Sequence, residues 1–235
     1  MSSSAPAIPL HSTRAHAWLG VALGVWQQAP VRLTLVAFAP VLLEGLLQMV
    51  PIVGVVLSKL AVVIASGWAL LVVDAVVRNG AADPARQCRR LLRAPGVFGV
   101  ALLGVAVFAF QLLVCSVVVG PAQAALLATG QNAALAISPT TLGWVFASGL
   151  LPGAVLMFVL PLVVLDGQTP CNAIRRSIVL ATRHWPCVAI FTAIQVALVV
   201  PAPRVPALLL LLLPFGLCST YAIYRTVHAR LDPDR

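Results

Sequence analysis

The chain has 235 residues, of which 61% are apolar and 9% are charged, and its mean hydropathy is +1.03. A soluble domain is about half apolar and about a quarter charged, so this composition excludes an ordinary water-soluble protein. The formal charge of +9 would suggest nucleic-acid binding in a soluble protein, but in a membrane protein the side on which each charge lies is more informative. We therefore expect an integral membrane protein without a nucleic-acid partner.

The first segment, residues 1–12, is rich in Ser and Pro and is predicted to form a short disordered tail. It lacks an apolar core followed by a small-residue cleavage site, so we do not expect a cleaved signal peptide. Residues 13–225 are predicted to form a single transmembrane domain, and residues 226–235 a cytosolic C-terminal tail.

Apolar segments follow in chain order, and each is predicted to form a membrane-spanning helix, which needs about 20 apolar residues. Three prolines between positions 201 and 206 divide the last stretch, 187–224, which forms either two full spans or a shallow hairpin. The predicted spans are residues 31–49, 53–77, 96–119, 142–165, 187–200 and 207–224. The fold class is therefore an all-α polytopic membrane bundle of about six transmembrane helices.

The arginines predict the orientation of this bundle. With six spans, nearly all of them fall on one side, whereas the loop 120–141 has no charge and Arg204 is the only charged residue predicted outside. Positive charge is enriched on the cytosolic side of membrane proteins. We expect a multi-pass protein of a bacterial cytoplasmic (inner) membrane with both termini in the cytosol.

Each cytosolic segment that precedes a hairpin has a similar pattern: a candidate helix cap, an amphipathic stretch and a proline that ends it. The candidate caps are Thr13, Asp83 and Thr169. Pro84 and Pro170 suit the first helical position, where the missing N–H costs nothing. The terminating prolines are Pro30, Pro95 and Pro186. The pattern predicts three cytosolic-side interfacial helices and a threefold repeat with units near 13–77, 83–165 and 169–225.

Arginines on two of these helices are the candidate binding residues. The second helix has four of them at helical spacing, with Cys88, Leu91 and Leu92 on another face. The third has Ile174, Ile178, Ala181 and Trp185 on one side and Arg176 and Arg183 on the other. Each arginine beside anionic lipid contributes about 1 kcal/mol of binding. The candidate headgroup contacts are Arg86, Arg89, Arg90, Arg93, Arg175 and Arg176; enforcement of topology alone is the alternative interpretation.

Two charged residues fall inside predicted spans. Glu44 and Lys59 lie at equal distances from the connection 50–53, so they are expected at equal depth and able to form an intramembrane ion pair. A proton or ion relay is the alternative interpretation. Asp74 lies one helical turn before Arg78, which predicts an (i, i+4) pair.

Other residues suggest packing and anchoring. The glycines expected at close helix contacts are Gly96, Gly99, Gly104, Gly143, Gly149 and Gly153. Pro40, Pro152 and Pro161 are expected to kink their spans. The tryptophans predicted to anchor the protein in the membrane interface are Trp18, Trp26, Trp144 and Trp185.

We find no nucleophile with a base, paired carboxylates, histidine cluster or phosphate-binding glycine loop, so we expect a non-enzymatic protein without a metal or cofactor.

Two sets of residues resemble a known family. Trp26 with Pro30, the segment Pro51-Ile52-Val53-Gly54 and the turn Asn79-Gly80 resemble the first half of a family of uncharacterised proteobacterial inner-membrane proteins. Pro161, Asp166-Gly167, Pro170, Ala173-Ile174-Arg175-Arg176-Ser177 and Trp185 resemble its second half. The second set is also similar to the six-helix membrane domain attached to some glycerophosphodiester phosphodiesterases; this sequence shows no counterpart of their catalytic domain. The resemblance implies a fold and a location but no reaction.

Two functions are favoured at this point, and a lipid-modifying enzyme, which would need polar residues gathered at one membrane face, comes third. The basic helices favour a protein that organises anionic lipid, or a membrane-protein partner or second copy of itself, in the cytoplasmic membrane. The charged residues Glu44, Lys59 and Asp74 favour the alternative of a small transporter or permease.

Overall fold

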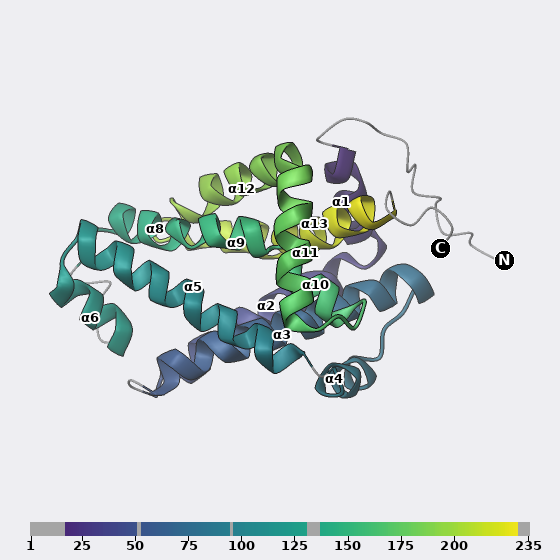
Figure 1. Ribbon diagram of the computed structural model, residues 1–235, viewed down its shortest axis with the longest axis horizontal. Coiled ribbons are helices and arrows are strands. Elements are labelled where there is room, and N and C mark those ends of the chain that lie inside the picture. Colours follow the sequence, from purple (N-terminus) through teal and green to yellow (C-terminus); the bar gives the residue numbers. More distant parts are fainter. Residues whose placement is uncertain (1–16, 51–52, 95, 131–136, 230–235) are drawn as a thin grey trace.

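The computed structural model describes residues 17–50, 53–94, 96–130 and 137–229, and every regular element in these residues is a helix (Figure 1). The helices are α1 (Ala17–Gln28), α2 (Pro30–Gln48), α3 (Val53–Asn79), α4 (Pro84–Leu92), α5 (Val97–Val118), α6 (Pro121–Thr129), α8 (Pro139–Ser148), α9 (Leu150–Leu156), α10 (Val159–Val164), α11 (Pro170–Arg183), α12 (Trp185–Val199), the 3-10 turn η1 (Pro206–Leu208) and α13 (Leu209–Ala229). The predicted tail 1–12, the cap Thr13, the turn residues 51–52 and Pro95 lie outside the described residues.

Five helical segments are long and apolar enough to cross a membrane, or six if the bent pair α11–α12 counts as one span. The first three predicted spans correspond to α2, α3 and α5. In Figure 1, α3, α5, α8, α9 and α13 run along the longest axis of the molecule, whereas α11 crosses them. The last turns of α3 and α13 lie at the same end as α4, which we call the basic end; α6 lies at the other end.

The fourth predicted span, 142–165, is not one helix. It is broken into α8, α9 and α10, with interruptions at Gly149 and at residues 157–158. A proline ring displaces the carbonyl four residues before it and provides no N–H to bond it. For Pro152 that carbonyl belongs to Ser148, and for Pro161 it belongs to Met157, so both interruptions occur where the prolines remove a helical hydrogen bond. Pro40, by contrast, lies inside the continuous helix α2.

The last predicted hairpin, 187–224, has unequal arms. α11 and α12 meet at a bend of 93°. α12 has 15 residues and is about 22 Å long at 1.5 Å per residue, which is shorter than a hydrocarbon core of about 30 Å. η1 and α13 complete the hairpin, and α13 extends to Ala229, beyond the predicted end of that span.

One helix was not predicted. The uncharged segment 120–141 was interpreted as a loop, but it contains α6, which packs against α5. Pro121 occupies the first turn of α6, and Gly130 ends it in the left-handed conformation with φ +72°. Pro at the start and Gly just after the end are the usual helix boundaries, so these two residues were the signal that we missed.

α1 packs on the bundle rather than lying open at its surface. It contacts α13, and Trp18, Ala22 and Val25 are buried. The prediction of an interfacial anchor is wrong for Trp18, which is 2% exposed and packs against the rings of Phe191 and Phe215. Trp144 and Trp185 are exposed, and Trp26 is partly buried and donates a hydrogen bond to Thr34.

Glycines set the closest helix contacts, as expected for membrane bundles. A Cβ at Gly143 would lie 2.1 Å from the carbonyl oxygen of Val200, and one at Gly104 would lie 2.7 Å from that of Lys59. Gly96, Gly99 and Gly149 also have neighbours that a Cβ would meet, but Gly153 has none within 4 Å. The packing prediction is therefore wrong for Gly153.

Candidate functional site

α4 is held at the basic end by a small set of contacts. The Asp83 carboxylate accepts hydrogen bonds from the N–H groups of Ala85 and Arg86 at 3.0 and 3.3 Å, so it caps the helix as predicted. The Trp68 indole N–H donates to the Pro84 carbonyl at 3.0 Å. Leu91 is 2% exposed and packs into a cluster with apolar residues of α3, α5 and α10. These contacts attach both ends of a short helix to the bundle.

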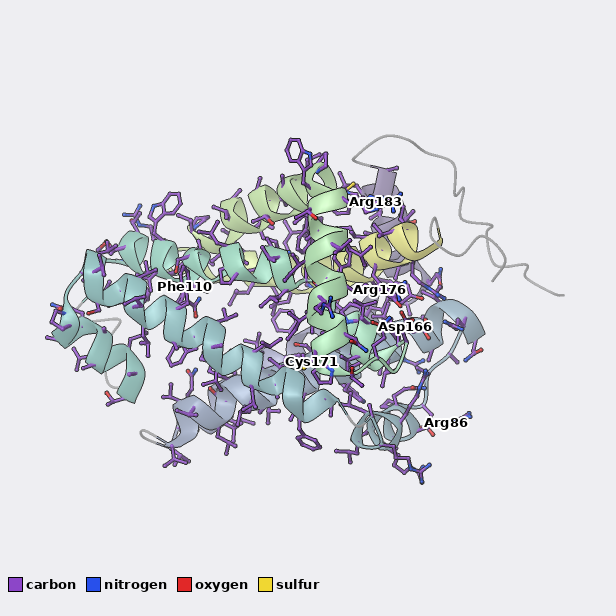
Figure 2. All side chains as sticks on the ribbon, in the orientation of Figure 1. Arg86, Phe110, Asp166, Cys171, Arg176 and Arg183 are labelled. Carbon is purple, nitrogen blue, oxygen red and sulfur yellow. The ribbon has the colours of Figure 1, made fainter. Side chains whose placement is uncertain are left out.

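The arginines of α4 all lie on its free surface. Arg86, Arg89, Arg90 and Arg93 are exposed and recur at i, i+3, i+4 and i+7, which places them along one face. Their guanidinium groups form no ion pair or hydrogen bond within the part of the chain that the structure describes. Figure 2 shows Arg86 pointing outward from α4.

The apolar face of α4 differs from the prediction. The whole face was expected at the headgroup boundary; Cys88 and Leu92 are exposed, but Leu91 is buried against the protein. Gln87 is the second buried residue of this helix. α4 thus has three surfaces: one on the bundle, one lined by the exposed Cys88 and Leu92, and one lined by arginines.

α11 has the same sequence pattern but a different environment. It buries Ala173, Ser177, Leu180 and Ala181 against neighbouring helices, which include α9 and α10. Ile178 and Trp185 are exposed, so the expected apolar side is divided between the protein and the outside. Arg175 and Arg183 are exposed and Arg176 is half-buried.

Two details separate α11 further from α4. Thr169 occupies the N-cap position but its side chain makes no capping hydrogen bond, so the predicted cap is wrong. Ser177 instead contacts the interruption between α9 and α10, where its Oγ donates to the Val155 carbonyl at 2.7 Å and accepts from the Phe158 N–H at 3.3 Å. Ser177 therefore bonds backbone groups that the broken helix leaves without helical partners.

The Glu44 and Lys59 side chains form an ion pair between α2 and α3, as their equal distances from the turn predict. Gln48 donates to Glu44 at 3.0 Å, and the Lys59 ammonium lies 4.8 Å from the centre of the Phe108 ring on α5. Both charged side chains are about one-fifth exposed, so the pair is partly covered. One carboxylate meets one ammonium here, which leaves no net charge.

A second charged cluster joins α3 to α13 at the basic end. Asp74 is 3% exposed, and its Oδ1 accepts hydrogen bonds from Arg78 Nε at 3.0 Å and from the Tyr221 hydroxyl at 2.9 Å. Arg225 Nη2 lies 3.5 Å from the same oxygen, and Arg225 Nε donates to the Tyr221 oxygen at 3.2 Å. The Asp74–Arg78 pair was predicted from spacing. Tyr221 and Arg225 were not.

The second tyrosine of α13 makes a parallel contact. The Tyr224 hydroxyl donates to Asp166 Oδ1 at 2.5 Å, which connects α13 to the turn between α10 and α11. The chain has only two tyrosines, and they lie three residues apart in its last span. Hydroxyl groups inside an apolar helix usually need a partner, so this spacing was the available signal for the cluster.

Comparison of the chain with protein-family models, with curated proteins and with solved structures finds no match. The family resemblance of the sequence therefore stays a prediction. The chain is an all-helical protein with several helices apolar enough for a membrane.

Proposed function

We propose that the protein binds anionic phospholipid at the cytosolic face of a bacterial inner membrane, with the arginine face of α4 as the contact surface. The observation that carries this proposal is the state of Arg86, Arg89, Arg90 and Arg93: all four are exposed, and no acidic side chain of the described residues neutralises them. The function is non-enzymatic, because binding requires only these cations and the bilayer.

The position of α4 supports this assignment. It lies between α3 and α5 in the chain, beside the last turn of one candidate span and the first turn of the next. Exposed Leu92 and Phe98 can enter the acyl boundary while the arginines meet phosphates. A helix held by Asp83, Trp68 and Leu91 presents its arginines without first having to order itself.

The test compares three versions of the full chain in native-lipid discs by mass spectrometry of the copurified lipids. We expect the wild type to be enriched in anionic over zwitterionic phospholipid. At about 1 kcal/mol per arginine, Arg86/Arg89/Arg90/Arg93→Gln should reduce this enrichment by roughly a hundredfold or more. The lysine version of the same four positions keeps the charge and should retain most of the enrichment, because lysine is also attracted to phosphate.

Arg204→Gln is the matched control, since Arg204 precedes η1, at the opposite end of α13 from the basic end. It should leave the enrichment unchanged. Unaltered enrichment in the glutamine variant of α4 would refute lipid binding by this surface. A stoichiometric copurified protein that is lost from the same variant would instead assign the surface to a protein partner.

A second candidate function, a small transporter or permease, is favoured by the Glu44–Lys59 ion pair between two candidate spans. The interrupted helices α8, α9 and α10 add to it, because broken spans line many transport sites. Asp74, the third residue of this hypothesis, lies in the separate cluster with Tyr221. Proton flux into vesicles should fall in Glu44→Gln and in Lys59→Met if the pair relays charge; wild-type flux in both would exclude that mechanism.

A further inference from the structure

The cluster around Asp74 contains more positive than negative charge. Asp74 carries one negative charge, whereas Arg78 and Arg225 each carry one positive charge, and both approach the same oxygen of Asp74. The Glu44–Lys59 pair has no such surplus. One arginine is enough to balance the charge of a buried carboxylate. Charge neutralisation therefore does not account for the second guanidinium group.

The hydrogen bonds hold both guanidinium groups in defined positions. Arg78 is bound through Nε, which leaves its two terminal nitrogens without a partner in the described residues. Arg225 is bound through Nε and Nη2, and its guanidinium carbon lies 5.7 Å from the centre of the Tyr221 ring. Tyr221 and Asp74 thus hold both guanidinium groups beside one carboxylate oxygen, and each group keeps N–H donors that these bonds do not use.

The exposure of the two side chains shows that the free N–H groups are accessible. Asp74 is buried, but the side chain of Arg78 is 56% exposed and that of Arg225 is 35% exposed. Arg78 is close to the end of α3 and Arg225 is close to the end of α13, and these two helix ends lie at the basic end (Figure 1). An anion that approaches this end meets two preorganised guanidinium groups, with the carboxylate behind them.

We propose that Arg78 and Arg225, positioned by Asp74 and Tyr221, form a stoichiometric binding site for one phosphodiester anion. Planar guanidinium groups match phosphate oxygens with paired hydrogen bonds. A single negative charge neutralises the single surplus positive charge of the cluster. The site is separate from α4, whose arginines line an open helix face and have no carboxylate support.

The experiment is native mass spectrometry of the full chain in detergent, titrated with phosphatidylglycerol and, in parallel, with zwitterionic phosphatidylcholine. The wild type should bind one phosphatidylglycerol more tightly than phosphatidylcholine. Arg78→Gln should weaken this first binding event roughly tenfold, because a charge-assisted contact is lost. Tyr221→Phe should weaken it less, since it removes the hydroxyl that bonds Asp74 and Arg225 but keeps both guanidinium groups. Arg204→Gln should leave it unchanged.

The variants separate this site from the proposed surface of α4. Arg78→Gln is therefore also made in the glutamine variant of the four α4 arginines, where it should still weaken one phosphatidylglycerol binding event roughly tenfold, so the two proposals can fail independently. Arg225 is half-buried, and its replacement could destabilise the fold. The exposed Arg78 is therefore the residue whose substitution tests the proposal. Glycerophosphoglycerol, the soluble headgroup, distinguishes the two sources of the phosphodiester. If it competes with phosphatidylglycerol, the site binds free phosphodiesters; if it does not compete, the site binds the lipid. Equal affinity for the two lipids, or unchanged affinity in Arg78→Gln, would overturn the proposal.

Discussion

α4 and α11 have similar sequence patterns and different structural roles. Each begins with a proline after a candidate cap and carries several arginines. α4 buries only Gln87 and Leu91, so nearly all of its surface is free. α11 buries four residues, crosses the bundle and supplies the Ser177 hydroxyl to a broken neighbour. Two helices with similar arginine content thus differ in how much of their surface the bundle buries, and this burial cannot be read from the arginines alone.

The largest effect that separates the two helices is expected at Leu91. Truncation to alanine removes the only apolar side chain that anchors α4 and leaves a cavity beside Leu71 and Val164. Leu91→Ala should lower the free energy of unfolding by about 2 to 5 kcal/mol, measured by denaturation in mixed detergent micelles. Leu92→Ala is the matched control, because Leu92 is 58% exposed, and its effect should be within about 0.5 kcal/mol. Equal losses in the two variants would show that Leu91 does not anchor α4.

The next effect concerns α11 and its serine. Ser177→Ala leaves the Val155 carbonyl and the Phe158 N–H without their partner. We expect a loss of about 1 to 3 kcal/mol in the same unfolding assay, because interhelical hydrogen bonds in membranes contribute modestly. Thr182→Ala removes a hydroxyl that bonds only carbonyls of α11 itself, and it should cost much less. A serine variant as stable as the threonine variant would contradict this role.

The smallest effect distinguishes the two N-termini. Asp83→Ala should destabilise α4 by about 1 kcal/mol, because the carboxylate accepts from two backbone N–H groups. Thr169→Ala should change the stability by only a few tenths of that amount, since the Thr169 side chain makes no capping bond. Hydrogen exchange of the first-turn amides of α4 and α11 measures both. A larger increase in exchange in Thr169→Ala than in Asp83→Ala would reverse the assignment.

Features that depend on short separations along the chain could be predicted from the sequence. The spans α2, α3 and α5 follow from uninterrupted apolar length, and the cap at Asp83 follows from its position before Pro84. The Glu44–Lys59 pair follows from equal distances to one turn, and the Asp74–Arg78 pair from one helical turn. In each case the partner lies on the same helix or on the next one.

Features that depend on distant partners could not be predicted. Tyr221 and Asp74 are separated by 147 positions, so no local periodicity brings them together. Pro152 and Pro161 indicated kinks. An interrupted helix is tolerated where another helix bonds the backbone groups that lose their helical partners. Here that helix is α11, through Ser177. Likewise, the buried position of Trp18 depends on Phe191 and Phe215, which come much later in the chain.

The dependence of the α9–α10 interruption on Ser177 has a consequence for biogenesis. Residues 139–164 emerge from the ribosome before α11 does, and at that moment the Val155 carbonyl and the Phe158 N–H have no protein partner. Unsatisfied backbone groups cost several kcal/mol each in hydrocarbon. Ser177 can make these two bonds only once α11 is present, so we expect the α9–α10 interruption to reach its final geometry after α11 has packed against it.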